Sequence, residues 1–117
     1  MLVEDQEMVR KMTRALLVRF GFEVLVAEDG AEAVKIFRDH QADIKLVLSD
    51  LTMPRMNGWD TLDALRAMQP DIPFILASGY SEAQAVAEKH GQQSYLFLRK
   101  PYQKKALKEI LELALGR

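Results

Sequence analysis

Polar side chains with complementary chemistry follow four of the apolar segments that have the length of buried strands. These residues are Glu4-Asp5, Asp50, Ser78 and Lys100. Because the carboxyl ends of parallel strands meet at one edge of a sheet, we expect these side chains to converge. Converging carboxylates repel one another unless a divalent cation lies among them, and a few oxygen ligands with room for water favour Mg²⁺. With a hydroxyl and a lysine added, such a group is suited to phosphoryl transfer, in which a carboxylate can itself be the acceptor.

Asp50 is the leading candidate for that acceptor. The apolar run 46–48 predicts a buried strand that ends on this carboxylate, and Pro54, Asn57 and Gly58 indicate an irregular loop after it. Two simpler interpretations remain open at this point. Asp50 could merely cap a turn, and the acidic pair could cap the helix that follows it.

The composition indicates a single globular domain spanning residues 1–117. The net charge is −1, so the chain has no general attraction to nucleic acid or to an anionic membrane. The absence of cysteine excludes disulfides, thiolate metal sites and cysteine nucleophiles, and is compatible with the cytoplasmic location that we expect. The longest apolar runs are the length of strands, so we predict no membrane segment.

Strand and helix patterns alternate along the whole chain. Strands are predicted within residues 1–3, 23–26, 43–49, 73–77 and 95–98, and helices within 9–20, 29–40, 57–69, 81–91 and 107–114. Asp29 and Asn57 are predicted N-caps, Gly21 ends the first helix, and Val9, Met12, Leu16 and Phe20 form its predicted buried face. The alternation predicts an α/β fold with a five-stranded parallel sheet and helices on both faces. Right-handed crossovers favour a doubly wound, flavodoxin-like order, 2-1-3-4-5.

Four segments resemble the receiver domain of response regulators in two-component signalling, the chemotaxis-regulator family. They are LVEDQ at 2–6, VLSDLTMPRMNG at 47–58, ILASGY at 75–80 and FLRKPY at 97–102. The similarity extends over essentially the whole chain, and four segments in this order are specific. The segments SGYSE at 78–82 and RKPY at 99–102 are similar to the corresponding segments in receivers of hybrid histidine kinases.

The resemblance implies a role for each residue of the constellation. Asp50 would be phosphorylated by a histidine kinase or a histidine phosphotransfer protein. Asp5, supported by Glu4, would bind Mg²⁺ together with Asp50 and the backbone carbonyl of Thr52. Ser78 and Lys100 would contact the phosphoryl group, and the protein would catalyse only its own phosphorylation and dephosphorylation.

The resemblance also predicts how the signal leaves the site and how long it lasts. Phe97 occupies the family's aromatic switch position, although an aromatic residue in a strand is commonly core. The surface of the fourth helix, fifth strand and fifth helix would contact a downstream protein or an attached domain; a weak dimer is left open. Thr52 and Tyr80 lie two positions beyond Asp50 and Ser78, and because neither is an acid or amide, we expect slow autodephosphorylation.

Three other functional classes are weighed against this one. A degenerate receiver would bind partners without phosphorylation, but the acceptor, acidic pair and lysine are all present. A phosphatase of the haloacid-dehalogenase type needs a second aspartate where this chain has Thr52. A flavin-binding electron carrier would need a Ser/Thr/Gly-rich phosphate loop after the first strand, which the sequence lacks.

Overall fold

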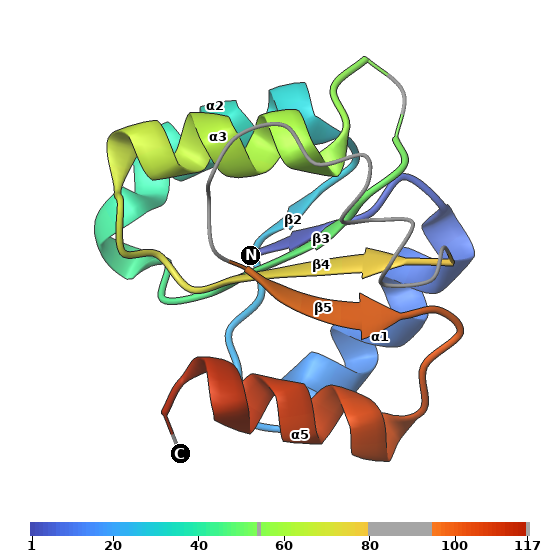
Figure 1. The fold of residues 1–117 in the computed structure, drawn as a ribbon. Helices are drawn as coiled ribbons and strands as arrows, with labels where there is room; N and C mark the ends of the chain where they lie inside the picture. Colours follow the sequence, from blue (N-terminus) through green and yellow to red (C-terminus); the bar gives the residue numbers. More distant parts are fainter. Residues whose placement is uncertain (54, 80–94, 117) are drawn as a thin grey trace.

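The computed structural model describes residues 1–53, 55–79 and 95–116. Its centre is a sheet of five parallel strands in the order β2-β1-β3-β4-β5 (Figure 1). The strands are β1 Leu2–Val3, β2 Val26–Ala27, β3 Val47–Asp50, β4 Phe74–Ser78 and β5 Leu96–Arg99. The doubly wound, flavodoxin-like order predicted from the sequence is therefore confirmed.

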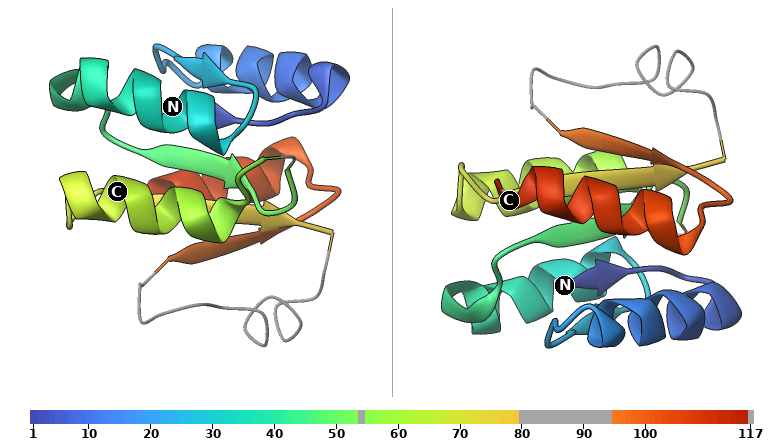
Figure 2. Two further views of the ribbon diagram at one scale, coloured as in Figure 1. Left: turned by 90° about the horizontal axis from the view of Figure 1, so that it is seen from above. Right: turned by 90° about the horizontal axis from the view of Figure 1, so that it is seen from below.

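Helices cover both faces of the sheet, as predicted. They are α1 Glu7–Arg19, α2 Gly30–His40, α3 Gly58–Met68 and α5 Lys104–Ala114, with a short 3-10 helix, η1, at Gln41–Asp43. Figure 2 shows α2 and α3 side by side over one face, and α1 and α5 over the other. The predicted helix within 81–91 lies outside the described residues.

Alternate side chains of the strands supply two separate cores. Val47 and Leu76 belong to the cluster under α2 and α3, whereas their neighbours Leu48 and Ile75 belong to the cluster under α1 and α5. All four are at most 3% exposed. This burial on both faces is why the central strands read as continuous apolar runs rather than as alternating patterns.

Local sequence signals predicted the starts of α2 and α3 and the end of α1 correctly. The Asp29 carboxylate accepts a hydrogen bond from Glu32 N at 2.8 Å, and the Asn57 side chain accepts one from Asp60 N at 2.9 Å. Both residues are therefore N-caps. Gly21, with φ of 97°, follows the end of α1 in the left-handed conformation that glycine tolerates best.

Two strand predictions and one helix face were wrong. The second strand is Val26–Ala27 rather than 23–26, because β1 offers only two residues as register partners. The third strand is Val47–Asp50 rather than 43–49, because its register with β4 begins at Val47, opposite Phe74, and η1 ends at Asp43. On α1, Met12 was predicted to lie on the buried face but is 64% exposed, and the next residue, Thr13, is buried instead.

Within the described part of the chain, no helix is long and apolar enough to cross a membrane.

Candidate functional site

Three strand ends direct charged side chains to one point at the carboxyl edge of the sheet. Glu4, Asp50 and Lys100 each lie two positions beyond a leucine of the core under α1 and α5, namely Leu2, Leu48 and Leu98. Because side chains two apart on a strand share a face, the three groups meet on that side. The Lys100 Nζ lies 2.6 Å from Glu4 Oε1 and 3.3 Å from Asp50 Oδ1.

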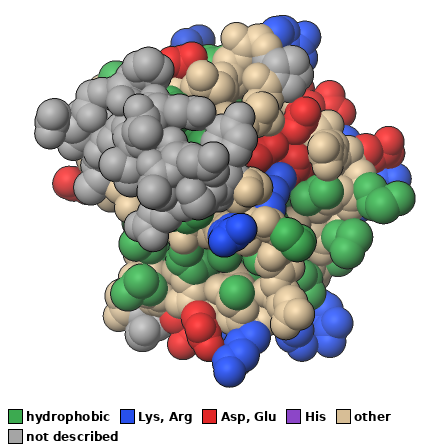
Figure 3. Space-filling model, turned by 45° about the vertical axis from the view of Figure 1, so that its right-hand side comes forward, with side chains coloured by type: hydrophobic (Ala, Val, Ile, Leu, Met, Phe, Trp, Pro, Cys, Tyr) green, Lys and Arg blue, Asp and Glu red, His purple; other side chains and the backbone are tan. Residues whose placement is uncertain are grey.

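Asp5 completes an acidic cluster with these residues. One carboxylate oxygen each from Glu4, Asp5 and Asp50 lies within 4.8 Å of the others. The Asp5 Oδ1 atom is buried and has no hydrogen-bond partner among the described residues. Three carboxylates against one lysine leave excess negative charge, and an oxygen-only donor set that includes an unpartnered buried oxygen fits Mg²⁺. Figure 3 shows acidic side chains gathered next to basic ones on this face.

The surroundings of the cluster raise the pKa of both Asp50 and Lys100. Burial, and then the neighbouring Glu4 carboxylate, raise the pKa of Asp50 to about 7, although Lys100 opposes this. Burial tends to lower the pKa of Lys100, but its contacts with Glu4 and Asp50 outweigh burial and raise it. Lys100 therefore stays charged, whereas Asp50 ionises less readily than an ordinary aspartate, and additional positive charge would favour its ionised form.

Gly58 allows the loop after β3 to pack against the Asp50 backbone. A Cβ atom added at Gly58 would lie 2.6 Å from the carbonyl oxygen of Asp50 and 2.8 Å from Leu51 Cα. The Gly58 amide also donates to the Leu51 carbonyl at 2.7 Å. In the sequence Gly58 indicates only a loop, because its packing role depends on a close backbone approach that leaves no local pattern.

The same loop is held against the start of α2. Arg55 has φ of 67° and forms an ion pair with Asp29, whose side chain is 3% exposed. A Cβ atom at Gly30 would lie 2.7 Å from the carbonyl oxygen of Met56, so the backbones of the two segments are in close contact. Sequence reasoning identified Asp29 only as a cap. Nothing in the spacing of Asp29 and Arg55 indicates that they meet.

The remaining predicted residues lie at different distances from the cluster. Ser78 is buried at the end of β4, and its carbonyl accepts a hydrogen bond from Lys100 N at 2.7 Å. Thr52 is exposed in the loop after Asp50, and Phe97 is half-buried against the core under α2 and α3. Tyr80 lies outside the described residues.

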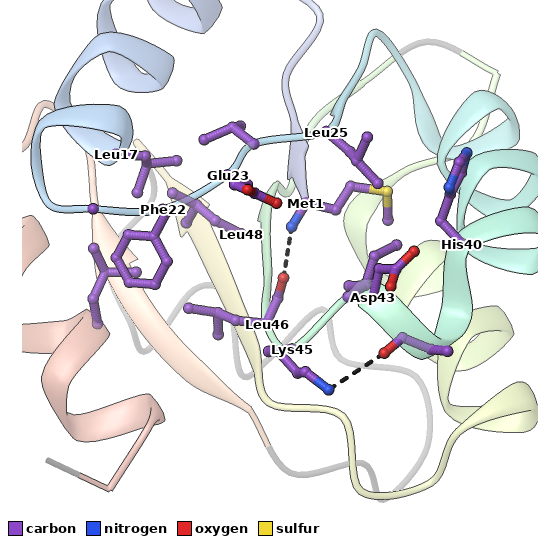
Figure 4. A pocket seen from close by; sticks show the side chains of 15 residues that line it. Met1, Leu17, Phe22, Glu23, Leu25, His40, Asp43, Lys45, Leu46 and Leu48 are labelled. Atoms are coloured by element: carbon purple, nitrogen blue, oxygen red, sulfur yellow. Dashed lines mark hydrogen bonds between the residues drawn. The ribbon is translucent and has the colours of Figure 1, made fainter.

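A cavity lined by described residues is remote from this cluster. It has a volume of about 520 Å³ at the amino ends of the strands, and its lining includes Met1, Phe22, Leu25 and Leu46 (Figure 4). The Met1 amino group donates to the Leu46 carbonyl at 2.7 Å beside it. None of the charged residues predicted from strand ends contributes to this cavity.

The family model for the response regulator receiver domain matches residues 1–112. The chain belongs to the receiver domain family. Receiver domains are signalling modules of two-component systems rather than classical enzymes, and they work with histidine kinases or phosphotransfer proteins and with attached output domains.

Individual relatives show the family in two contexts. This receiver domain is 37% identical over 116 residues to the sensor kinase CckA of Brucella abortus, covering 96% of the chain but 12% of the kinase. It is 31% identical over 117 residues to the chemotaxis protein CheY of Bacillus subtilis, covering 99% of the chain and 96% of CheY. The crystal structure of the receiver domain of the hybrid histidine kinase CckA is similar, with a TM-score of 0.81 and 33% sequence identity. The match covers 97% of this chain and 95% of the CckA receiver chain.

Proposed function

We propose that this receiver domain accepts a phosphoryl group on Asp50 from a phosphohistidine of a histidine kinase or a histidine phosphotransfer protein. The observation that carries the proposal is the cluster itself. Asp50 Oδ1 lies 3.3 Å from Lys100 Nζ, and one carboxylate oxygen of Asp50 lies within 4.8 Å of carboxylate oxygens of Glu4 and Asp5. A degenerate receiver would have no reason to keep this combination of buried like charges, which costs stability.

In the transfer, a carboxylate oxygen of Asp50 forms a bond to phosphorus as the P–N bond to the donor imidazole breaks, and the imidazole leaves with that electron pair. Lys100 neutralises charge on the phosphoryl oxygens, and the Ser78 hydroxyl donates to one of them. Asp5, Asp50, the Thr52 carbonyl and, in support, Glu4 would hold Mg²⁺. When bound, Mg²⁺ supplies the positive charge that lets carboxylates and phosphoryl oxygens approach.

The phosphoryl group would change the surface of the domain through Ser78 and Phe97. When the Ser78 hydroxyl turns toward the phosphoryl group, the ring of Phe97 can turn further inward behind β4. Phe97 pairs in register with Leu76 of that strand and is half-buried, which supports this route. The surface formed by the fourth helix, β5 and α5 would then bind a downstream partner.

The lifetime of the phosphoryl group would depend on Thr52 and Tyr80. Neither side chain can act as an acid or amide that orients an attacking water, so hydrolysis would be slow. The module would span residues 1–117, act in the cytoplasm and signal to a protein partner or an attached domain rather than to nucleic acid.

Phosphorylation by a small donor tests the proposal. The protein is incubated with acetyl phosphate with and without Mg²⁺, and the mass of the intact chain and of its peptides is measured. We expect one Mg²⁺-dependent phosphoryl group on Asp50, retained in Asp60→Asn, an exposed-acid control, and lost in Asp50→Asn. Modification of the Asp50→Asn protein at the wild-type level would overturn the assignment.

A further inference from the structure

A hydroxyl–hydroxyl hydrogen bond joins α1 to the segment that carries Lys100. Thr13 Oγ1 lies 2.8 Å from the Tyr102 hydroxyl. Thr13 is 3% exposed, and Tyr102 packs against the core under α1 and α5. A polar pair in such surroundings is stabilised only while both members are present, because each satisfies the other.

This bond lies close to Lys100 along the chain. Tyr102 is two residues beyond Lys100, and on the preceding side the Lys100 amide donates to the Ser78 carbonyl at 2.7 Å. The backbone of Lys100 is therefore attached to β4 directly and to α1 through Tyr102. The Lys100 side chain is only 21% exposed. Packing therefore confines its stem, and the position of the backbone decides which oxygens the ammonium reaches.

The same helix also holds the acidic pair. Arg10, one turn before Thr13, donates to the carbonyl oxygen of Glu4 at 3.0 Å and to that of Asp5 at 3.4 Å. One face of α1 thus contacts the acids through Arg10 and the lysine segment through Thr13. The separation between the two halves of the site depends on this helix.

We infer that Thr13 and Tyr102 are positioning residues for Lys100, and that their hydrogen bond fixes the lysine at the distance needed to contact the phosphoryl group on Asp50. The inference rests on the proposed function, because a phosphoryl group on Asp50 is the group that Lys100 would contact. Neither residue touches the reacting atoms. Their effect should therefore pass entirely through Lys100.

A double-mutant cycle tests the bond. Tyr102→Phe and Thr13→Val each remove one hydroxyl and keep the shape of the side chain. The affinity for beryllofluoride, which mimics a phosphoryl group on aspartate, is measured at saturating Mg²⁺ in the wild type, both single variants and the double variant. We expect each single variant to bind roughly three- to tenfold more weakly, and the double variant to be no weaker than the weaker single variant.

A second cycle tests whether the effect passes through Lys100. In a Lys100→Met protein, Tyr102→Phe should leave the beryllofluoride affinity unchanged, whereas a general loss of structure would weaken binding in either background. The affinity for Mg²⁺ alone should change less than twofold in Tyr102→Phe, because this variant keeps the proposed metal ligands and the positive charge of Lys100 beside them.

The outcomes separate this inference from the proposed function. Additive losses in the first cycle, or an equal loss with and without Lys100, would overturn the positioning role while leaving Asp50 as the acceptor. Failure of the wild-type protein to bind beryllofluoride would instead overturn the proposed function, and this inference with it.

Discussion

Lys100 contacts Glu4 more closely than it contacts Asp50. Its ammonium lies 2.6 Å from Glu4 Oε1, compared with 3.3 Å from Asp50 Oδ1, and the Glu4 side chain is 3% exposed. Without a phosphoryl group, the lysine is therefore the main neutralising partner of a buried glutamate. From the sequence, Glu4 was predicted only to support the metal site, and its pairing with Lys100 was not predicted.

Removing the charge of Lys100 should destabilise the metal-free protein. In Lys100→Met, the Glu4 carboxylate stays buried without its cation, and we expect a loss of about 3 kcal/mol in the free energy of unfolding. Saturating Mg²⁺ should restore part of it. Urea unfolding with and without Mg²⁺ measures both effects. Lys104→Met, at an exposed position at the start of α5, is the matched control and should change stability little. Equal losses in the two variants would contradict a specific Lys100–Glu4 contribution.

Asp50→Asn should stabilise the metal-free protein, and this gain in the free energy of unfolding should depend on pH. Because the pKa of Asp50 is raised from 3.8 to about 7 on folding, the folded state binds this proton more tightly than the unfolded state does. Ionisation of Asp50 then lowers stability as pH rises from about 4 to about 7. Three pKa units correspond to about 4 kcal/mol, and solvent at the open edge of the site reduces this to about 2 kcal/mol.

The gain in Asp50→Asn should consequently be absent below pH 4 and complete above pH 7. Thermal or urea unfolding in EDTA across this range checks it, with Asp60→Asn as an exposed-acid control. A gain of the same size at pH 4 and pH 8 would show that it comes from packing rather than from the carboxylate charge.

Asp5→Asn should weaken Mg²⁺ binding and stabilise the metal-free fold. Its Oδ1 atom is buried without a described partner and lies in the acidic cluster. Loss of one negative charge should reduce Mg²⁺ affinity on the order of tenfold or more, while relieving repulsion in the absence of metal. Isothermal titration with Mg²⁺ and unfolding in EDTA measure the two effects. Glu7→Gln, an exposed acid in the first turn of α1, should change neither. Unchanged Mg²⁺ affinity in Asp5→Asn would exclude Asp5 as a ligand.

Gly58→Ala should displace the loop after β3. The new Cβ would lie 2.6 Å from a backbone oxygen of Asp50, and backbone atoms cannot move aside as a flexible side chain can. We expect a loss of about 1–3 kcal/mol in stability together with slower phosphorylation of Asp50. Gly79→Ala, whose added Cβ would meet no atom of the described residues within 4 Å, serves as the stability control. If both alanine variants unfolded at the same urea concentration, the close approach at Gly58 would have no energetic consequence.

Local sequence signals determined the kind of structure and the identity of the main charged residues. The alternation of apolar runs with helical patterns predicted the parallel sheet, the right-handedness of crossovers favoured its order, and Asp29, Asn57 and Gly21 predicted helix ends correctly. These features depend on interactions between residues a few positions apart, or on burial on both faces of a strand, and both leave a pattern in the sequence. The parallel arrangement then brought strand ends to one edge, so Glu4, Asp5, Asp50 and Lys100 could be grouped before the structure was considered.

Only the tertiary structure decided which of these groups contact one another and what holds them there. The Lys100–Glu4, Arg55–Asp29 and Thr13–Tyr102 contacts join residues 96, 26 and 89 positions apart. Such contacts depend on helix rotation and the exact depth of each side chain, and neither of these repeats along the chain. The rotation of α1 is one example, because Thr13 can be buried only where Tyr102 satisfies its hydroxyl, and this pairing has no local signature.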